Sequence, residues 1–122
     1  MGRVVLVTGV AGSFASRVSR ALAELGADGG IDRVVGLDLR PPDGDLRGVK
    51  FVRADIRTPV VAKVIAVEEI DTVVHLDVNP AEGRGSSGAK ERNVIGTMQL
   101  LAACQRSTVV SKFVLGSSSA VY

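Results

Sequence analysis

The chain alternates short apolar runs with segments in which apolar residues recur at longer spacing. Each short run is rich in Val, Ile or Leu and ends at residues that favour a turn or a loop, which predicts strands. Five such runs occur, at residues 3–8, 33–38, 49–54, 71–76 and 112–116. Because residues 3–8 are almost entirely apolar, we expect a strand that is buried on both faces, as in parallel sheets.

The segment after the first run has helical periodicity. Between residues 13 and 25 the apolar side chains are spaced so that they form one stripe along a helix, and Gly26 supplies a C-terminal stop. We expect this stripe to be the buried face of the helix. Its members are Phe14, Val18, Ala21, Leu22 and Leu25.

Two later segments also predict helices. Thr58 followed by Pro59 is typical of an N-cap and a first-turn proline, and this pair opens a helix that reaches about residue 67. A longer amphipathic helix is expected from about residue 89 to about residue 105, with Cys104 packed on its apolar side. The positions that define this side are Val94, Met98, Leu101 and Ala102.

The order of these elements predicts the fold class. Strands that alternate with helices imply right-handed crossovers and a parallel sheet. We therefore expect an α/β protein with a doubly wound parallel sheet of the Rossmann-like kind, truncated after about five strands. A chain of 122 residues fits one domain, which would span residues 1–122.

Composition excludes several classes of function. Apolar residues make up 46% of the chain and charged residues 23%, as in an ordinary globular protein. One Cys and one His exclude a disulfide scaffold and a metal centre with several Cys or His ligands. No apolar run is long enough to span a membrane, and the first residues do not resemble a secretory signal, so a cytoplasmic location is expected. Scattered basic residues and few aromatic ones disfavour nucleic-acid binding.

The residues between the first strand and the first helix carry the clearest chemical signal, Thr8-Gly9-Val10-Ala11-Gly12-Ser13-Phe14-Ala15. A dinucleotide pyrophosphate needs backbone N–H groups within reach, which side chains at Gly9 or Gly12 would obstruct, and a helix N-terminus that faces it. The small side chain of Ala15 lets the helix approach the strand. The pattern favours a pyrophosphate site over the alternative, a tight turn in which the glycines serve only the backbone.

Asp38 lies at the expected end of the second strand. A carboxylate at this position accepts hydrogen bonds from both hydroxyl groups of an adenosine ribose and repels a 2′-phosphate, so NAD is preferred over NADP. Arg40, two residues later, keeps NADP open as the less favoured cofactor. The alternative is that Asp38 only starts the turn that leads to Pro41 and Pro42.

Polar residues follow two later strands. Asp55 can accept a hydrogen bond from an adenine amino group while Ile56 packs on the ring, and a helix-capping role for Asp55 fits the sequence equally well. Arg53 and Arg57 are expected to be solvated or to lie near a phosphate. His75 ends an apolar strand, where a structural imidazole bonded to the backbone is favoured.

Six blocks of sequence follow one another along the whole chain. They are Thr8 to Ala15, Asp38, Asp55-Ile56, Asp71-Thr72-Val73-Val74-His75-Leu76, Glu91-Arg92-Asn93-Val94-Ile95-Gly96-Thr97 and Ser117-Ser118-Ser119-Ala120-Val121-Tyr122. Together they resemble the N-terminal part of the extended short-chain dehydrogenase/reductase family, the NAD-dependent epimerases and dehydratases that act mainly on nucleotide sugars. Six blocks in the right order are more specific than any single motif.

This resemblance implies a cofactor site on the first half of the chain. Gly9, Gly12 and the amides near Phe14 and Ala15 would bind the pyrophosphate of NAD. Asp38 would hold the adenosine ribose. The same resemblance implies transient oxidation of a sugar hydroxyl, with hydride passing to NAD and returning to the sugar.

Further roles are implied for later residues. Asp55 and Ile56 would bind adenine, Leu76 would lie against the cofactor, and Asn93 would lie near the nicotinamide or the substrate. In the family's Ser/Thr-x-x-Val-Tyr pattern the catalytic hydroxyl lies four residues before the tyrosine, which makes Ser118 the implied catalytic residue. The alternative for the three consecutive serines is a polar loop at a strand end.

The chain departs from the family pattern in three respects. Ala15 stands where many members have glycine, a change to another small residue. Asp77 stands where the family usually has alanine, and a carboxylate beside a pyrophosphate would be repelled, so it points to solvent or the site is modified. The Tyr-x-x-x-Lys pair is absent, because the only tyrosine, Tyr122, is the last residue. We therefore do not expect the chain alone to complete the reaction.

Two interpretations of function stay open. The first is an NAD-dependent epimerase/dehydratase-like oxidoreductase acting on a nucleotide sugar, in which this chain supplies the cofactor-binding half of a longer protein. The alternative is a non-catalytic dinucleotide-binding or redox-sensing module, or an interaction protein of the same fold. Because a sheet that ends at the fifth strand has an open edge, we also expect association into a homo-oligomer through that edge or lost order near the C-terminus.

Overall fold

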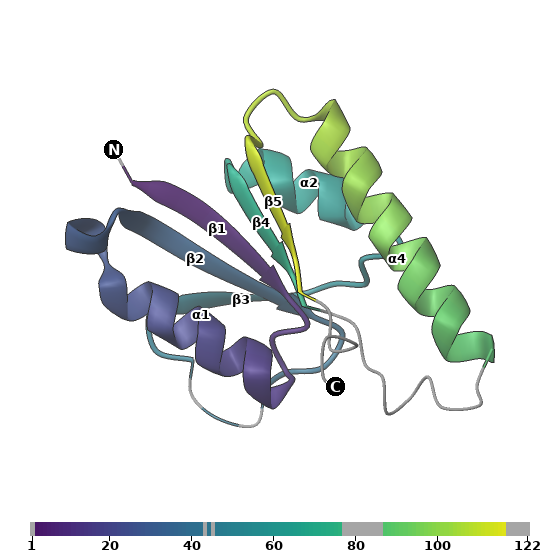
Figure 1. The fold of residues 1–122 in the computed structure, drawn as a ribbon, viewed down its shortest axis with the longest axis horizontal. Coiled ribbons are helices and arrows are strands. Elements are labelled where there is room, and N and C mark those ends of the chain that lie inside the picture. The colour runs from purple at the N-terminus through teal and green to yellow at the C-terminus, as the bar shows by residue number, and fades with distance from the viewer. Residues whose placement is uncertain (1, 43, 45, 77–86, 117–122) are drawn as a thin grey trace.

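In the computed structural model, five parallel strands form one sheet with helices on both faces (Figure 1). The structure describes residues 2–42, 44, 46–76 and 87–116, with the backbone alone at residues 13 and 87–94. The strands are β1 (Arg3–Thr8), β2 (Ile31–Asp38), β3 (Val49–Arg53), β4 (Thr72–His75) and β5 (Lys112–Leu115). The helices are α1 (Ser13–Leu25), a short 3₁₀ helix η1 (Ala27–Gly29), α2 (Val60–Val67) and α4 (Ser87–Arg106).

The strand order is β3-β2-β1-β4-β5. The chain builds β2 and β3 on one side of β1 and then crosses to build β4 and β5 on the other side. In a doubly wound sheet, ligands bind where this direction reverses, outside the carboxyl ends of the strands. The expected α/β class with a doubly wound parallel sheet is confirmed. It places the ends of β1 and β4 next to each other, because Thr8 pairs with His75 in the sheet register.

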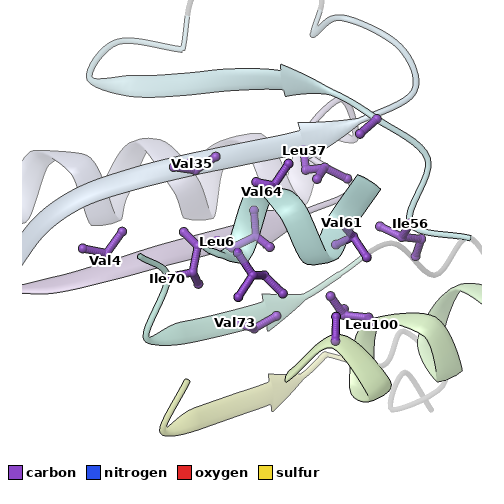
Figure 2. Close-up of a cluster of buried hydrophobic side chains, with 13 residues drawn as sticks. Val4, Leu6, Val35, Leu37, Ile56, Val61, Val64, Ile70, Val73 and Leu100 are labelled. Atoms are coloured by element: carbon purple, nitrogen blue, oxygen red, sulfur yellow. The ribbon is translucent and has the colours of Figure 1, made fainter. Parts of the chain in front are cut away.

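The two faces of the sheet carry separate cores. The larger cluster lies on the side of α2 and α4 and combines Leu6, Leu37, Ile65, Ile70 and Leu100 with smaller aliphatic residues (Figure 2). The smaller cluster lies on the side of α1 and contains Val5, Val7, Ala15, Ile31 and Val34. Both are built from aliphatic side chains, as β-branched runs in a parallel sheet require.

The buried face of α1 differs from the predicted stripe. Phe14 and Leu25 are 61% and 52% exposed, whereas Ala15 and Ser19 are buried. Small side chains face the sheet because they let the helix lie close to it. Ser19 is tolerated there because its hydroxyl donates a hydrogen bond to the Ser16 carbonyl at 2.9 Å, so no polar atom is left without a partner.

The buried face of α4 is also rotated from the prediction. Met98 is 65% exposed and Leu101 is also exposed, whereas Leu100 and Ala103 are buried in the larger cluster. The reason is a close crossing at Gly96, where an added Cβ would lie 2.6 Å from Ile56 Cδ1. The predicted packing of Cys104 is confirmed, since it is half-buried against the same cluster.

The start of α2 corrects a second expectation. Pro59, and not Thr58, occupies the N-cap position, and no side chain caps the helix. The Thr58 hydroxyl instead donates a hydrogen bond to the Asp55 carbonyl at 2.8 Å. Thr58 therefore stabilises the turn that leads from β3 into the helix. Strand β2 also begins at Ile31, two residues before the predicted start.

Candidate functional site

The turn from β1 into α1 is held against β2 by its backbone. The N–H groups of Gly9 and Val10 donate hydrogen bonds to the Leu37 carbonyl at 2.9 and 3.3 Å, and the Gly12 N–H donates to the Gly9 carbonyl at 2.9 Å. Gly9 has φ of +71°, a left-handed conformation that favours glycine. At Gly12 the constraint is space, because an added Cβ would lie 3.3 Å from the Gly9 oxygen. Glycine is therefore favoured at position 9 by the backbone conformation and at position 12 by the lack of space for a Cβ.

Val10 anchors the same turn to the sheet. Its side chain is fully buried, and an added Cβ at Gly36 in β2 would lie 2.7 Å from Val10 Cγ2. Sequence reasoning missed this pair. The available signal was a glycine inside an otherwise apolar strand, which often marks a close approach by another part of the chain.

The N-terminus of α1 is not capped by a side chain. Gly12 is the N-cap residue, and the first turn contains no acidic residue. The first backbone N–H groups of a helix have no partner within the helix, and the helix dipole makes this end positive. The arrangement is suited to an anion, because no side chain caps the helix and its first turn contains no acidic residue.

Asp38 lies beside this turn, as the sequence suggested. Its Oδ2 accepts a hydrogen bond from the Ala11 N–H at 2.9 Å, and its Oδ1 accepts one from the Arg40 N–H at 3.2 Å. The first contact links the end of β2 to the glycine-rich turn. The second is the local turn contact that the alternative interpretation of Asp38 predicts. The half-buried carboxylate makes both contacts at once.

Asp55 forms an ion pair at the end of β3. The Arg57 guanidinium donates to both carboxylate oxygens, with Nε 3.0 Å from each and Nη2 2.6 Å from Oδ2. The Arg57 N–H also donates to Oδ1 at 2.9 Å. Hydrogen bonding from Arg57 holds the pKa of Asp55 below its ordinary value. The sequence left Arg57 solvated or near a phosphate; in the structure its guanidinium is paired with Asp55 while 37% of its side chain stays exposed.

Ile56 contributes to the core. Its side chain is 5% exposed and packs in the larger cluster against Gly96 of α4. This burial does not match the expected packing of the side chain on an adenine ring. The helix-capping alternative for Asp55 is not what the structure has either, since its carboxylate binds the Arg57 N–H, ahead of the first residue of α2.

His75 is fully buried at the end of β4 and contacts two hydroxyl groups. Nδ1 lies 2.7 Å from Thr8 Oγ1, and Nε2 lies 2.9 Å from Thr97 Oγ1 on α4. The expected backbone partner of the imidazole is therefore wrong. Burial lowers the pKa of His75 from 6.5 to about 4, so the ring is neutral at pH 7. Thr97 is a second residue that sequence reasoning missed, because it lies 22 residues away along the chain.

The remaining predicted residues are distributed around this edge. Leu76 is half-buried against the smaller cluster, and its N–H donates to Thr8 Oγ1 at 2.9 Å. Asn93 lies in α4, where only its backbone is described. Asp77 and Ser118 lie outside the described residues. The structure thus brings together Gly9, Gly12, Asp38 and Leu76, with Asp55 at the end of the outer strand β3.

Within the described part of the chain, no three His, Cys, Asp or Glu side chains are grouped so that they could hold a metal ion. No helix among the described residues has the length and apolar character needed to cross a membrane.

Comparison with known families gives a match along most of the chain. The model of the NAD dependent epimerase/dehydratase family matches residues 5–122. Among curated proteins, uncharacterized proteins of Mycobacterium tuberculosis and Mycobacterium bovis are 43% identical over 127 residues. The match covers 98% of this chain and 33% of each of those proteins. The chain therefore spans about a third of the length of these relatives.

Better-described relatives act on nucleotide sugars. A trifunctional UDP-glucose 4,6-dehydratase, epimerase and reductase of Arabidopsis thaliana is 31% identical over 129 residues, covering 97% of this chain and 19% of that protein. A crystal structure of UDP-glucose-4-epimerase from Stenotrophomonas maltophila, with bound NAD and formylated UDP-arabinopyranose, is 31% identical with a TM-score of 0.77. That match covers 98% of this chain and 38% of the epimerase.

A further match shows the fold alone. The L-threonine dehydrogenase of Phytophthora infestans has a TM-score of 0.78 at 22% identity, and the match covers 99% of this chain and 38% of that enzyme. The same architecture thus occurs in a dehydrogenase named for an amino acid and in epimerases named for sugars. The fold by itself does not identify the substrate.

Proposed function

The chain belongs to the NAD-dependent epimerase/dehydratase family, and we propose that residues 1–122 form the NAD-binding half of an oxidoreductase that acts on a nucleotide sugar. The observation that carries this proposal is the turn between β1 and α1. There an uncapped helix N-terminus and the Asp38 carboxylate of the neighbouring strand lie together. A dinucleotide needs both features, one for its pyrophosphate and one for its adenosine ribose.

The turn fits a pyrophosphate. The absence of a Cβ at Gly9 and Gly12 keeps the backbone open to close approach, and the helix end supplies N–H donors and a positive dipole. We assign pyrophosphate binding to Gly9, Gly12 and the amides at Phe14 and Ala15. The Phe14 side chain is exposed, and the buried Ala15 side chain packs in the smaller cluster.

Asp38 supports NAD over NADP. Its carboxylate is anchored to the turn by the Ala11 N–H, so its place relative to the pyrophosphate is set by the backbone. A carboxylate so placed accepts hydrogen bonds from the ribose hydroxyls and repels a 2′-phosphate. Arg40 is the neighbouring residue that would favour NADP. We assign NAD as the cofactor because the Asp38 carboxylate is bound to the turn, whereas the Arg40 side chain is exposed to solvent.

The other assignments follow the strand ends. Asp55 and the backbone of Ile56 are assigned to adenine, with the Ile56 side chain serving the core. We assign Leu76, which follows β4, to a contact with the cofactor, and Asn93 to a position near the nicotinamide or the substrate. Ser118 is assigned a hydrogen bond to the reacting hydroxyl group. When bound, NAD supplies a hydride acceptor that also returns the hydride.

The substrate class rests on the relatives. The structure of the epimerase from Stenotrophomonas maltophila contains bound NAD and formylated UDP-arabinopyranose, and the Arabidopsis relative is named for UDP-sugar conversions. Since this chain covers only a part of each of these proteins, the sugar belongs to the proposal for the complete protein. Its chemistry is transient oxidation of a sugar hydroxyl followed by reduction.

Calorimetric titration of the chain with NAD and NADP tests the cofactor assignment. We expect NAD to bind more tightly than NADP, and the Asp38→Asn variant to lose about tenfold of that preference, because the repelling charge is gone. Equal affinity of the unmodified chain for the two cofactors would refute the role of Asp38. A lack of any thermal shift at millimolar NAD would refute the cofactor site and favour an interaction protein.

The glycine-rich turn has a matched control. Gly12→Ala places a Cβ 3.3 Å from the Gly9 oxygen and at the approach to the helix end, whereas Gly44→Ala places one in open space. We expect Gly12→Ala to weaken NAD binding about tenfold and Gly44→Ala to leave it unchanged. Equal affinities in the two variants would contradict the pyrophosphate assignment. Turnover of nucleotide sugars by the complete protein then separates an enzyme from a redox-sensing module, which would bind NAD without turnover.

A further inference from the structure

Three side chains connect the ends of β1 and β4 with α4. Thr8 Oγ1 is 2.7 Å from His75 Nδ1, and His75 Nε2 is 2.9 Å from Thr97 Oγ1. We call Thr8, His75 and Thr97 the Thr-His-Thr chain. Thr8 and His75 are fully buried, so solvent does not compete for their contacts. The imidazole therefore bridges two hydroxyl groups that come from different layers of the fold.

The imidazole of His75 is neutral, and its two hydrogen bonds run in a defined direction. Burial of His75 keeps the ring uncharged at pH 7, so one nitrogen donates a hydrogen bond and the other accepts one. Either Thr8 donates to Nδ1 while Nε2–H donates to Thr97, or both contacts run in the opposite direction. In both cases the geometry at one end of the ring constrains the other end, because the ring is rigid.

The first end of the chain lies at the root of the glycine-rich turn. Thr8 directly precedes Gly9, whose φ of +71° begins the turn. The Thr8 hydroxyl also accepts a hydrogen bond from the Leu76 N–H at 2.9 Å. A single hydroxyl thus ties the start of the turn both to the imidazole and to the backbone that follows β4.

The second end of the chain lies on α4. The neighbouring contacts of this helix are apolar, through Leu100 and Ala103, and apolar contacts are not directional. The contact between Nε2 and Thr97 is directional and selects one position of the helix along and around its axis. Asn93, which we assign to the nicotinamide or the substrate, lies one helical turn before Thr97.

We infer that His75 is a positioning residue, which couples the position of α4 to the conformation of the glycine-rich turn through Thr8 and Thr97. The inference rests on the proposed function for its effect on NAD, since the turn is the proposed pyrophosphate site. In this role the three side chains of the Thr-His-Thr chain act through the backbone and α4, and not by contact with a reacting atom. The role of the Thr-His-Thr chain is to hold two cofactor-facing elements at one separation before NAD arrives, which removes an ordering cost from binding.

The test uses substitutions at the far end of the chain, away from the turn. Thr97→Val keeps the shape of the side chain and removes the hydroxyl, and Thr97→Ser retains a hydroxyl. Thr108→Val is the matched control at an exposed position between α4 and β5. If Thr97→Val does not fold, Thr97→Ala takes its place. Calorimetry with NAD and urea unfolding are measured on each variant, because a purely structural role would change only the second.

We expect Thr97→Val to weaken NAD binding about threefold to tenfold under conditions where it is fully folded, and Thr97→Ser to restore most of the affinity. Thr108→Val should leave the affinity unchanged. Reduced stability of Thr97→Val with unaltered NAD affinity would overturn the positioning role and leave a structural one.

Backbone amide chemical shifts of the free chain separate this inference from the proposed function. We expect the Gly9 and Leu76 amide signals to move in Thr97→Val and to stay in place in Thr108→Val. If the unmodified chain binds no NAD, the proposed function fails, and these shifts still decide the coupling. Unmoved Gly9 and Leu76 signals overturn it, whereas moved signals support it.

Discussion

The carboxyl ends of the strands are held in two different ways on the two sides of the site. The ends of β1 and β4 are joined by the buried, neutral contact of Thr8 with His75. The ends of β2 and β3 carry carboxylates that solvent reaches, Asp38 bound to backbone N–H groups and Asp55 bound to Arg57. Buried polar contacts are costly to break, whereas exposed ionic contacts are weakened by water and salt.

This difference distinguishes a buried structural contact from carboxylates that a ligand could reach. A buried imidazole between two hydroxyl groups has no accessible surface left for a ligand, so its contribution to the site is indirect. The two carboxylates keep part of their surface exposed, which is what a group that binds ribose or adenine needs. The buried side is therefore expected to determine stability, and the exposed side to determine ligand choice. Substitutions at Thr8 and His75 should therefore lower the free energy of unfolding more than substitutions at Arg57 and Asp38.

Acid should lower the free energy of unfolding first through the buried His75. The pKa of His75 falls from 6.5 in an unfolded chain to about 4 in the fold, so between these values the unfolded state binds more protons. The free energy of unfolding is therefore highest above about pH 6.5 and falls as the pH is lowered toward about 4. The total decrease caused by His75 is about 3 kcal/mol. Urea unfolding across this range measures the loss, and His75→Gln should flatten the slope.

The exposed side titrates in a separate window. Asp55 has a pKa lowered from 3.8, so its contribution is present above that value and is lost at still lower pH. If the His75→Gln variant keeps the full slope between about pH 6.5 and pH 4, then carboxylates and not the imidazole cause it. That outcome would remove the proposed difference between the two sides.

Thr8→Val should give the next largest effect. The substitution preserves the shape of the side chain but removes the acceptor of the Leu76 N–H and the partner of His75 Nδ1. Leaving these buried groups without partners should lower the free energy of unfolding by about 2 kcal/mol. Thr8→Ser, which keeps the hydroxyl, is the control. A change below about 0.5 kcal/mol in Thr8→Val would contradict a structural role for the hydroxyl.

Arg57→Ala should have a smaller effect that depends on salt. The pair with Asp55 is partly exposed, so its loss should lower the free energy of unfolding by about 0.5–1 kcal/mol, less in high salt. Carbon-detected NMR titration should also find the pKa of Asp55 raised toward its ordinary value, because Arg57 is the main cause of the lowering. Arg53→Ala, an exposed neighbour at the end of β3, is the control. An unchanged Asp55 pKa would contradict this origin.

Asp38→Asn should have the smallest effect on stability. An amide oxygen still accepts the hydrogen bond from the Ala11 N–H, and only the contact with the Arg40 N–H at this partly exposed site is lost, so we expect a change below about 0.5 kcal/mol in urea unfolding. The same variant is expected to change the preference between NAD and NADP. A large loss of stability would mean that Asp38 serves the fold before the ligand, as its turn contact with Arg40 suggests in isolation.

The sequence predicted the strands well and the helix faces poorly. All five apolar runs form strands within two residues of the expected bounds, because apolar, β-branched runs fit only the interior of a sheet. On α1 and α4, two members of the predicted apolar stripes, Phe14 and Met98, are exposed instead of buried. Small residues place these helices, because Ala15 lets α1 lie on the sheet and Gly96 lets α4 approach Ile56 after β3, and a pattern of apolar stripes does not reveal them.

The candidate site divides in the same way. The glycine-rich turn and Asp38 were found from local spacing, and the structure brings them together. The pairing of Asp55 with Arg57 was missed although the two are neighbours in sequence, because residue types alone do not indicate whether a side chain turns inward to a carboxylate or outward to water. The partners of His75 were missed because they come from β1 and α4, far away along the chain.

By itself, the sequence determined the parallel α/β fold, the position of the glycine-rich turn and the presence of a carboxylate next to it. These depend on spacing and backbone conformation within a few residues, where each residue acts on its immediate neighbours. Only the tertiary structure decided which side of each helix is buried, and that Thr8, His75 and Thr97 form one chain. Such contacts depend on how closely whole elements approach one another, and that distance is set by packing over the entire domain.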